Sequence, residues 1–166
     1  MIRHGNAKRS DDKQRWFKTL TGSKIRIRTP GADTDNRLTV VEFLEPPDTN
    51  PPVFTRHEFI EVFCVISGTL TFQFIGEEKF HLTAGDSVTR QSFKPHSFWN
   101  DTSTPVTVLL FCTPAGLDQI FIYIESDALL ARYRNNTHSA DYAAVMKRLR
   151  TKHGLEHVGE APEKNI

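Results

Sequence analysis

The chain has 166 residues, of which 38% are hydrophobic, and this is the size and apolar content of one domain with a single core. Its 21 Lys and Arg residues nearly balance its 20 Asp and Glu residues, so no general electrostatic attraction favours a nucleic acid or an anionic membrane as partner. No apolar run is long enough to span a bilayer, and Met1 to Asn6 lacks the apolar stretch of a secretory signal. We therefore expect a cytoplasmic protein whose partner is a small molecule.

Composition divides the chain into three parts. Residues 1–22 are mostly polar and charged, and only Trp16 and Phe17 could dock this arm on the rest of the molecule. Residues 23–115 consist of short β-rich segments broken by Gly, Pro, Asp and Asn, with no helical period. Residues 116–166 return to a helical spacing of apolar side chains. We expect an N-terminal arm, a β-barrel and a C-terminal helical extension of the same domain.

The β-rich part alternates strands with turns. A loop is expected at 31–36, and a break in the sheet at 46–52, because proline cannot donate to a β-ladder. Gly68 is predicted to be the pivot between two consecutive strands. Cys64 and Cys112 each lie inside an apolar run, which is typical of buried free thiols rather than of a disulfide. The strands expected in this part are 24–28, 38–44, 61–67, 69–75, 79–82 and 106–112.

Two helices are predicted after Gly116. Both have apolar residues on one face, so both should pack against the outside of the barrel. The second has Ser139 as its N-cap and Gly154 just past its end. Its Lys and Arg residues lie toward the C-terminal end, where they complement the helix dipole on a solvated face. The apolar faces consist of Leu117, Ile120, Phe121 and Ile124 in the first helix and of Tyr142, Val145, Met146 and Leu149 in the second.

One carboxylate and two histidines indicate a site inside the barrel. Glu61 shares a strand face with Phe63, and a carboxylate on an apolar face is either at the mouth of a cavity or buried at considerable cost. His57 precedes Glu61 by four residues. The second histidine, His96, shares its own strand face with Phe98 and Asn100.

The spacing of these residues forms two motifs with a family resemblance. The first contains Pro51-Pro52, Glu61 and Gly68, and the second contains Gly85-Asp86, His96 and Asn100. In both motifs the sequence resembles the small single-domain cupins that are similar to quercetin dioxygenase. Framework segments such as Thr113-Pro114-Ala115-Gly116 extend the resemblance over about residues 17–160. The resemblance implies an all-β fold, the cupin double-stranded β-helix or jelly-roll barrel, with the C-terminal helices packed outside.

The resemblance also implies one divalent metal ion in the barrel, which is Fe, Mn, Ni, Cu, Co or Zn. In the family, two histidines in a His-x-His motif, the glutamate and the second-motif histidine bind it. With one motif spacing His-x-His maps to Thr55-Arg56-His57, so that His57, Glu61 and His96 are the ligands. With the other spacing it maps to Phe54-Thr55-Arg56, only Glu61 and His96 remain, and the site holds no metal.

The register around His57 decides which side chains face a substrate. If His57 points inward, the Thr55 hydroxyl takes the place of the lost histidine through a bound water. If a bulge turns Arg56 inward instead, its guanidinium pairs with Glu61 and clamps an acidic or enolic substrate. We favour the inward His57. Phe93, which replaces a motif glycine, is expected at the barrel mouth. The candidate substrate-binding residues are Thr55, Arg56, Phe63, Phe93, Phe98 and Asn100.

Three functions stay open at this point. The resemblance favours a metal-dependent dioxygenase for an aromatic or enolic substrate, with Glu61 and His96 as catalytic residues. A metal-free cupin could instead isomerise, dehydrate or cyclise a natural-product intermediate, with a raised pKa making Glu61 the general base and His96 its partner acid. The third possibility is a ligand-binding barrel without catalysis. We also expect a homodimer, because the edge strand at 24–29 needs covering.

Overall fold

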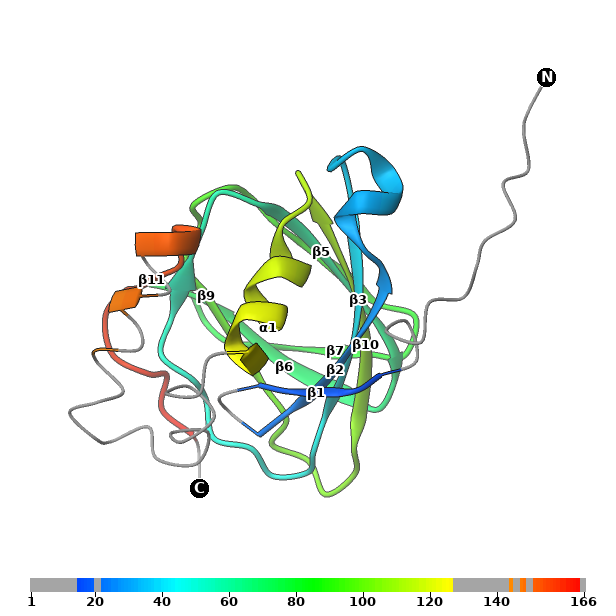
Figure 1. The fold of residues 1–166 in the computed structure, drawn as a ribbon. Coiled ribbons are helices and arrows are strands. Elements are labelled where there is room, and N and C mark those ends of the chain that lie inside the picture. The colour runs from blue at the N-terminus through cyan, green and yellow to red at the C-terminus, as the bar shows by residue number, and fades with distance from the viewer. Residues whose placement is uncertain (1–14, 20–21, 127–143, 145–146, 149–150, 165–166) are drawn as a thin grey trace.

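Two antiparallel sheets face each other in the residues that this computed structural model describes, which are 15–19, 22–126, 144, 147–148 and 151–164 (Figure 1). The order is β1-β2-β3-β10-β5-β8 in one sheet and β11-β4-β9-β6-β7 in the other. Together they form the double-stranded β-helix that the sequence predicts. The strands are β1 (Phe17–Lys18), β2 (Lys24–Thr29), β3 (Thr39–Glu45), β4 (Thr55–Arg56), β5 (Ile60–Ser67), β6 (Thr69–Phe74), β7 (Phe80–Thr83), β8 (Ser87–Arg90), β9 (His96–Trp99), β10 (Val106–Thr113) and β11 (Glu156–His157).

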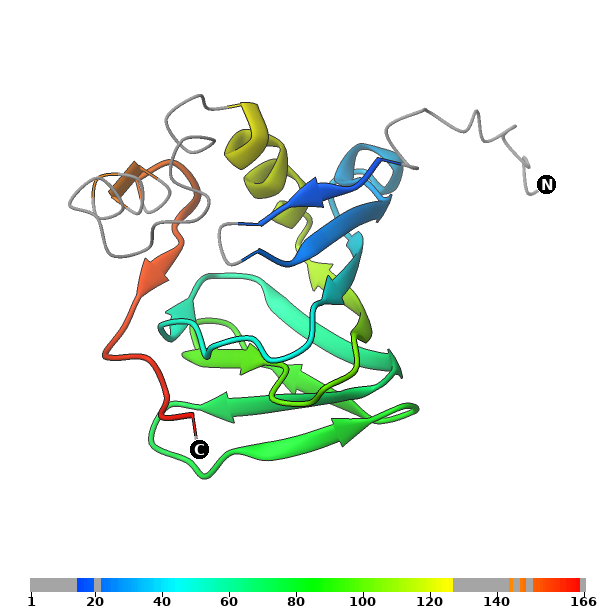
Figure 2. The ribbon, with the colours of Figure 1, turned by 90° about the horizontal axis from the view of Figure 1, so that it is seen from below.

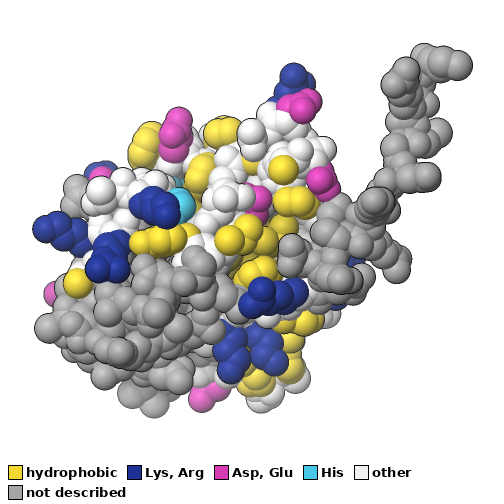
Figure 3. All heavy atoms as spheres, in the orientation of Figure 1, with side chains coloured by type: hydrophobic (Ala, Val, Ile, Leu, Met, Phe, Trp, Pro, Cys, Tyr) yellow, Lys and Arg dark blue, Asp and Glu magenta, His cyan; other side chains and the backbone are white. Residues whose placement is uncertain are grey.

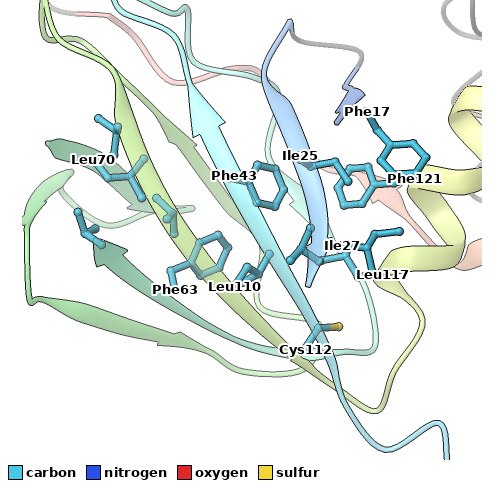
Figure 4. Packing of buried hydrophobic residues seen from close by; sticks show 14 of the residues in the cluster. Phe17, Ile25, Ile27, Phe43, Phe63, Leu70, Leu110, Cys112, Leu117 and Phe121 are labelled. Carbon is cyan, nitrogen blue, oxygen red and sulfur yellow. The ribbon is translucent and has the colours of Figure 1, made fainter. Parts of the chain in front are cut away.

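Alternation of apolar and polar residues accounts for the strands that were predicted. In β3 and β10 every second side chain is buried, and these side chains meet across the ladder as pairs such as Phe43 with Val108. β5 continues the core on the other side of β10, where Phe63 pairs with Leu110 (Figure 4). All six expected strands are present, with ends shifted by at most one residue. The expected loop at 31–36 contains a 3₁₀ turn at Gly31–Thr34.

Gly68 is the pivot that the sequence predicts. It joins β5 to β6, so the chain passes there from one sheet to the other. Its φ of 81° is in the left-handed region, and a Cβ at this position would lie only 2.7 Å from the carbonyl oxygen of Pro105. Both the backbone conformation and the close approach therefore require glycine.

Helix α1 (Leu117–Ser126) lies across one end of the barrel, as the two views in Figure 1 and Figure 2 show. Its buried residues Leu117, Ile120 and Phe121 are the first three of the predicted apolar face. The Asp118 carboxylate accepts hydrogen bonds from the amide of Gly31 and the hydroxyl of Thr39, which fixes the start of the helix. The side chain of Ile124 lies outside the described residues, as do Ser139, Tyr142, Val145, Met146 and Leu149.

The N-terminal arm docks on the barrel through one of the two aromatic residues that the sequence suggested. Phe17 docks in the core, but Trp16 stays 37% exposed. β1 pairs with β2, so the strand at 24–29 is not the sheet edge that we expected.

Both cysteines are free, with Cys112 buried as predicted and Cys64 only half-buried. Side chains of both charge signs are spread over the face in Figure 3, and no helix of the described part is long and apolar enough to cross a membrane.

Glu45 gives a prediction about stability. It lies at the end of β3 with 4% of its surface exposed, and the Ser23 hydroxyl donates a hydrogen bond to it at 2.7 Å. Burial raises its pKa to about 7, against the lowering effect of that hydrogen bond. The folded protein therefore keeps a proton that the unfolded chain releases near pH 4.5, so stability falls as pH rises from 4.5 to 7.

Replacing Glu45 by Gln removes this ionisation. We compare the free energy of unfolding of E45Q with that of the wild type. From pH 4 to pH 8 this difference should shift by about 3 kcal/mol in favour of E45Q. Urea unfolding at both pH values measures the difference. A difference between E45Q and the wild type that does not change with pH would show that Glu45 has an ordinary pKa.

Candidate metal centre

The side chains of His57, Glu61 and His96 meet inside the barrel. Glu61 is the second residue of β5, His96 begins β9, and His57 follows the short strand β4. All three residues are between 2% and 4% exposed. The Glu61 Oε2 atom lies 3.3 Å from His57 Nε2 and 3.5 Å from His96 Nε2. One ligand atom from each residue lies within 4.8 Å of the other two.

Pairing of β4 on both sides places His57 in the interior. Thr55 lies opposite His96 on one side and His157 of β11 on the other. Arg56 points away from the site and forms an ion pair with Glu156 at 2.6 Å. The inward His57 is therefore the register that the structure has, and the alternative of an inward Arg56 paired with Glu61 is wrong.

The proton on the His96 ring is fixed by a backbone group. His96 Nδ1 lies 3.1 Å from the carbonyl oxygen of Thr55, and this oxygen can only accept, so Nδ1 carries the hydrogen. Burial lowers the pKa of His96 to about 4; the Glu61 carboxylate opposes this effect, and the neighbouring Arg90 and His57 add to it. His96 is thus neutral at pH 7, with the lone pair of Nε2 toward Glu61.

Glu61 is ionised at the same pH. Burial would raise its pKa, but His57, His96 and Arg90 outweigh this effect and lower the pKa to about 2. The raised pKa expected of Glu61 as a general base in a metal-free enzyme is therefore not found. The neutral Nε2 of His96 and the anionic Oε2 of Glu61 face each other at 3.5 Å. Two atoms with lone pairs at this separation are stabilised by a cation that both can bind.

The donor set fits a divalent transition metal. Two imidazoles and one carboxylate are a known ligand set for such ions. Imidazole nitrogens and carboxylate oxygens bind them at about 2.1 Å, so two atoms on the same ion are roughly 3.0 to 3.4 Å apart. The distance of 3.3 Å from Glu61 Oε2 to His57 Nε2 lies within this range, and the distance of 3.5 Å to His96 Nε2 lies just above it. The bond from His96 Nδ1 to a carbonyl is also the usual outer contact of a metal-bound histidine.

Arg90 is a member of the site that sequence reasoning missed. It lies opposite Glu61 in the pairing of β8 with β5, and it is fully buried. Its Nε and Nη2 atoms each lie 3.0 Å from Glu61 Oε2. The alternation of β8 could have indicated it, because Arg90 shares a strand face with Val88, which packs against the core.

Aromatic rings surround the centre. The Phe63 ring centroid lies 5.7 Å from that of His96, and Phe98 stacks on His96 at 6.3 Å. Phe72, which was not among the candidates, also stacks on the His96 ring, with the two ring centroids 5.6 Å apart. The sequence suggested an interior pocket, but these rings and the low exposure of His57, Glu61 and His96 make the centre closed to solvent in this structure.

The remaining candidate residues lie away from the metal centre or contribute only a backbone atom to it. Thr55 provides its carbonyl to His96. Phe93 is 57% exposed, and it adopts a φ of 56° where the family motif has glycine. Asn100 is buried in a loop, where its amide donates to the carbonyls of Pro46 and Thr104. The structure therefore brings Phe63 and Phe98 to the centre, and it does not bring Arg56, Phe93 or Asn100 there.

Comparisons with known proteins agree with this fold. Residues 41–112 match the family model described as the Cupin_2 cupin domain. The solved structure of ectoine synthase from P. lautus is 14% identical, with 66% of this chain and 76% of that chain covered and a TM-score of 0.55. KdgF from Halomonas sp. is 18% identical, with coverages of 66% and 96% and a TM-score of 0.53. The Cupin_2 domain of an XRE family transcriptional regulator from Enterobacter cloacae is 26% identical, with coverages of 55% and 95% and a TM-score of 0.49. No curated protein matches the sequence.

Proposed function

We propose that this chain, whose residues 41–112 match the Cupin_2 cupin domain, is an enzyme that binds one divalent metal ion through His57, Glu61 and His96 and oxygenates an aromatic or enolic small molecule. The observation that carries this proposal is the buried contact between the neutral Nε2 of His96 and the anionic Oε2 of Glu61. The ectoine synthase from P. lautus has a similar fold, and its name shows that a protein with this fold can be an enzyme.

Each residue of the centre has a distinct role in this function. Glu61 supplies the negative charge, and the carbonyl of Thr55 holds His96 in the tautomer that leaves Nε2 free to bind. When bound, the ion would act as a Lewis acid on a substrate oxygen, and a redox-active ion would also support chemistry with oxygen. Phe63 and Phe98 pack against His96 and against each other, so they exclude water from the centre.

Metal analysis of protein purified without a histidine tag tests the proposal. We expect close to one equivalent of Fe, Mn, Ni, Cu, Co or Zn after reconstitution, and turnover of an aromatic or enolic substrate that is lost with strong chelators and without oxygen. Less than about a tenth of an equivalent after reconstitution would remove the metal from the proposal.

A metal-free cupin with non-redox chemistry is the second candidate, and the observation in its favour is the Arg90 cation beside Glu61. Activity that survives both chelation and anaerobic conditions would support it. Ligand binding that is the same in Glu61→Gln and His96→Ala, with no turnover of any candidate substrate, would instead indicate a binding barrel without catalysis.

A further inference from the structure

Arg90 makes more contacts in the centre than an ion pair with Glu61 requires. Its Nη1 donates to the carbonyl oxygens of His57 and Gln91, both at 3.0 Å. Its Nη2 lies 2.7 Å from Nδ1 and 3.2 Å from Nε2 of His57, in addition to 3.0 Å from Glu61 Oε2. The side chain is fully buried. Since arginine stays protonated in proteins, a permanent positive charge lies against two of the three metal ligands.

This charge is close to the place where an ion would bind. An ion bonded to Glu61 Oε2 at about 2.1 Å would lie within about 5 Å of Arg90 Nη2. The surrounding side chains are buried, so solvent and salt screen the repulsion between the two cations poorly. The guanidinium also lies within hydrogen-bond distance of His57 Nε2, the atom nearest to Glu61. An ion and the observed position of Arg90 therefore compete for the same two residues.

We propose that Arg90 is an internal counter-cation, which keeps His57 and Glu61 in place without a metal ion and which the ion must displace in order to bind. This inference rests on the proposed metal function. It adds that displacing Arg90 lowers the affinity of the wild type for the ion. It differs from the usual role of an outer contact, which orients a ligand and strengthens metal binding. The two roles give opposite results when the arginine is removed.

The test is the affinity of the purified full chain for Zn²⁺ and Mn²⁺, measured by competition with a chromophoric chelator. We expect Arg90→Met to bind each ion at least tenfold more tightly than the wild type. Arg26→Met is the matched control, because Arg26 also forms an ion pair, with Glu42 at 2.7 Å, and lies on a different strand from all three ligands. It should leave the affinity unchanged. Equal or weaker binding by Arg90→Met would overturn the inference.

A measurement on the wild type keeps the test independent of how well Arg90→Met folds. The buried Arg90 Nε–H bonded to Glu61 should give a protected NMR signal in protein labelled with ¹⁵N-arginine. Zn²⁺ should shift this signal at the same stoichiometry at which it binds. A signal that stays in place while Zn²⁺ binds would show that Arg90 is not displaced. If neither the wild type nor Arg90→Met binds any metal, the proposed function itself fails, whereas equal binding by both removes only the role of Arg90.

Discussion

Replacing Glu61 by Leu should lower the free energy of unfolding by about 3 to 5 kcal/mol in the presence of a chelator. The reason is that Arg90 then remains fully buried without the carboxylate that two of its nitrogens contact at 3.0 Å. A buried charge that loses its partner is far more costly than a pair that is removed as a whole. Urea unfolding followed by circular dichroism measures this loss.

The double variant Glu61→Leu with Arg90→Met is the control for this prediction. Both charges are then absent and both replacements are apolar, so most of the lost stability should return. If the double variant is as unstable as the sum of the two single variants, the two residues do not interact. A single Glu61→Leu variant as stable as the wild type would show that Arg90 reaches solvent.

Replacing His96 by Ala should weaken the binding of a divalent ion by roughly 100-fold or more, because a lost ligand costs more than the 10- to 100-fold typical of an outer contact. Turnover should fall with it. The matched control is His81→Ala, since His81 is an exposed histidine of β7 whose ring contacts the Thr71 hydroxyl. Equilibrium dialysis with Mn²⁺ measures the affinity of both variants, and equal affinities would remove His96 from the centre.

The strands of the barrel could be predicted from the sequence because local patterns determine them. Alternation marks the buried faces of β3 and β10, and Gly68 is required by its own φ and by the nearby carbonyl of Pro105. The short strands β4 and β11 gave no such signal. Their pairing joins Arg56 to Glu156, which is 100 residues away in the chain, and residues this far apart carry no local pattern that connects them.

The candidate site, like the barrel, could be predicted in part from the sequence. The resemblance of two motifs to the cupin family implied His57, Glu61 and His96 as ligands under one of two motif spacings, and the structure brings these three residues together. Arg90 was missed because arginine in a strand is usually a surface residue, and only the pairing of β8 with β5 places it opposite Glu61. An arginine beside Glu61 entered the sequence analysis only in the alternative register that we did not favour, and there it was Arg56, the neighbour of His57 in the chain.

The most direct test of the metal centre is anomalous diffraction from crystals grown with an excess of Mn²⁺ or Zn²⁺. One strong peak should lie about 2.0 to 2.2 Å from a nitrogen of His57, an oxygen of Glu61 and Nε2 of His96. The Arg90 guanidinium should have moved away from Glu61 Oε2 in the same crystals. A map with no peak among these three side chains, with Arg90 still in contact with Glu61, would contradict the assignment of a metal centre.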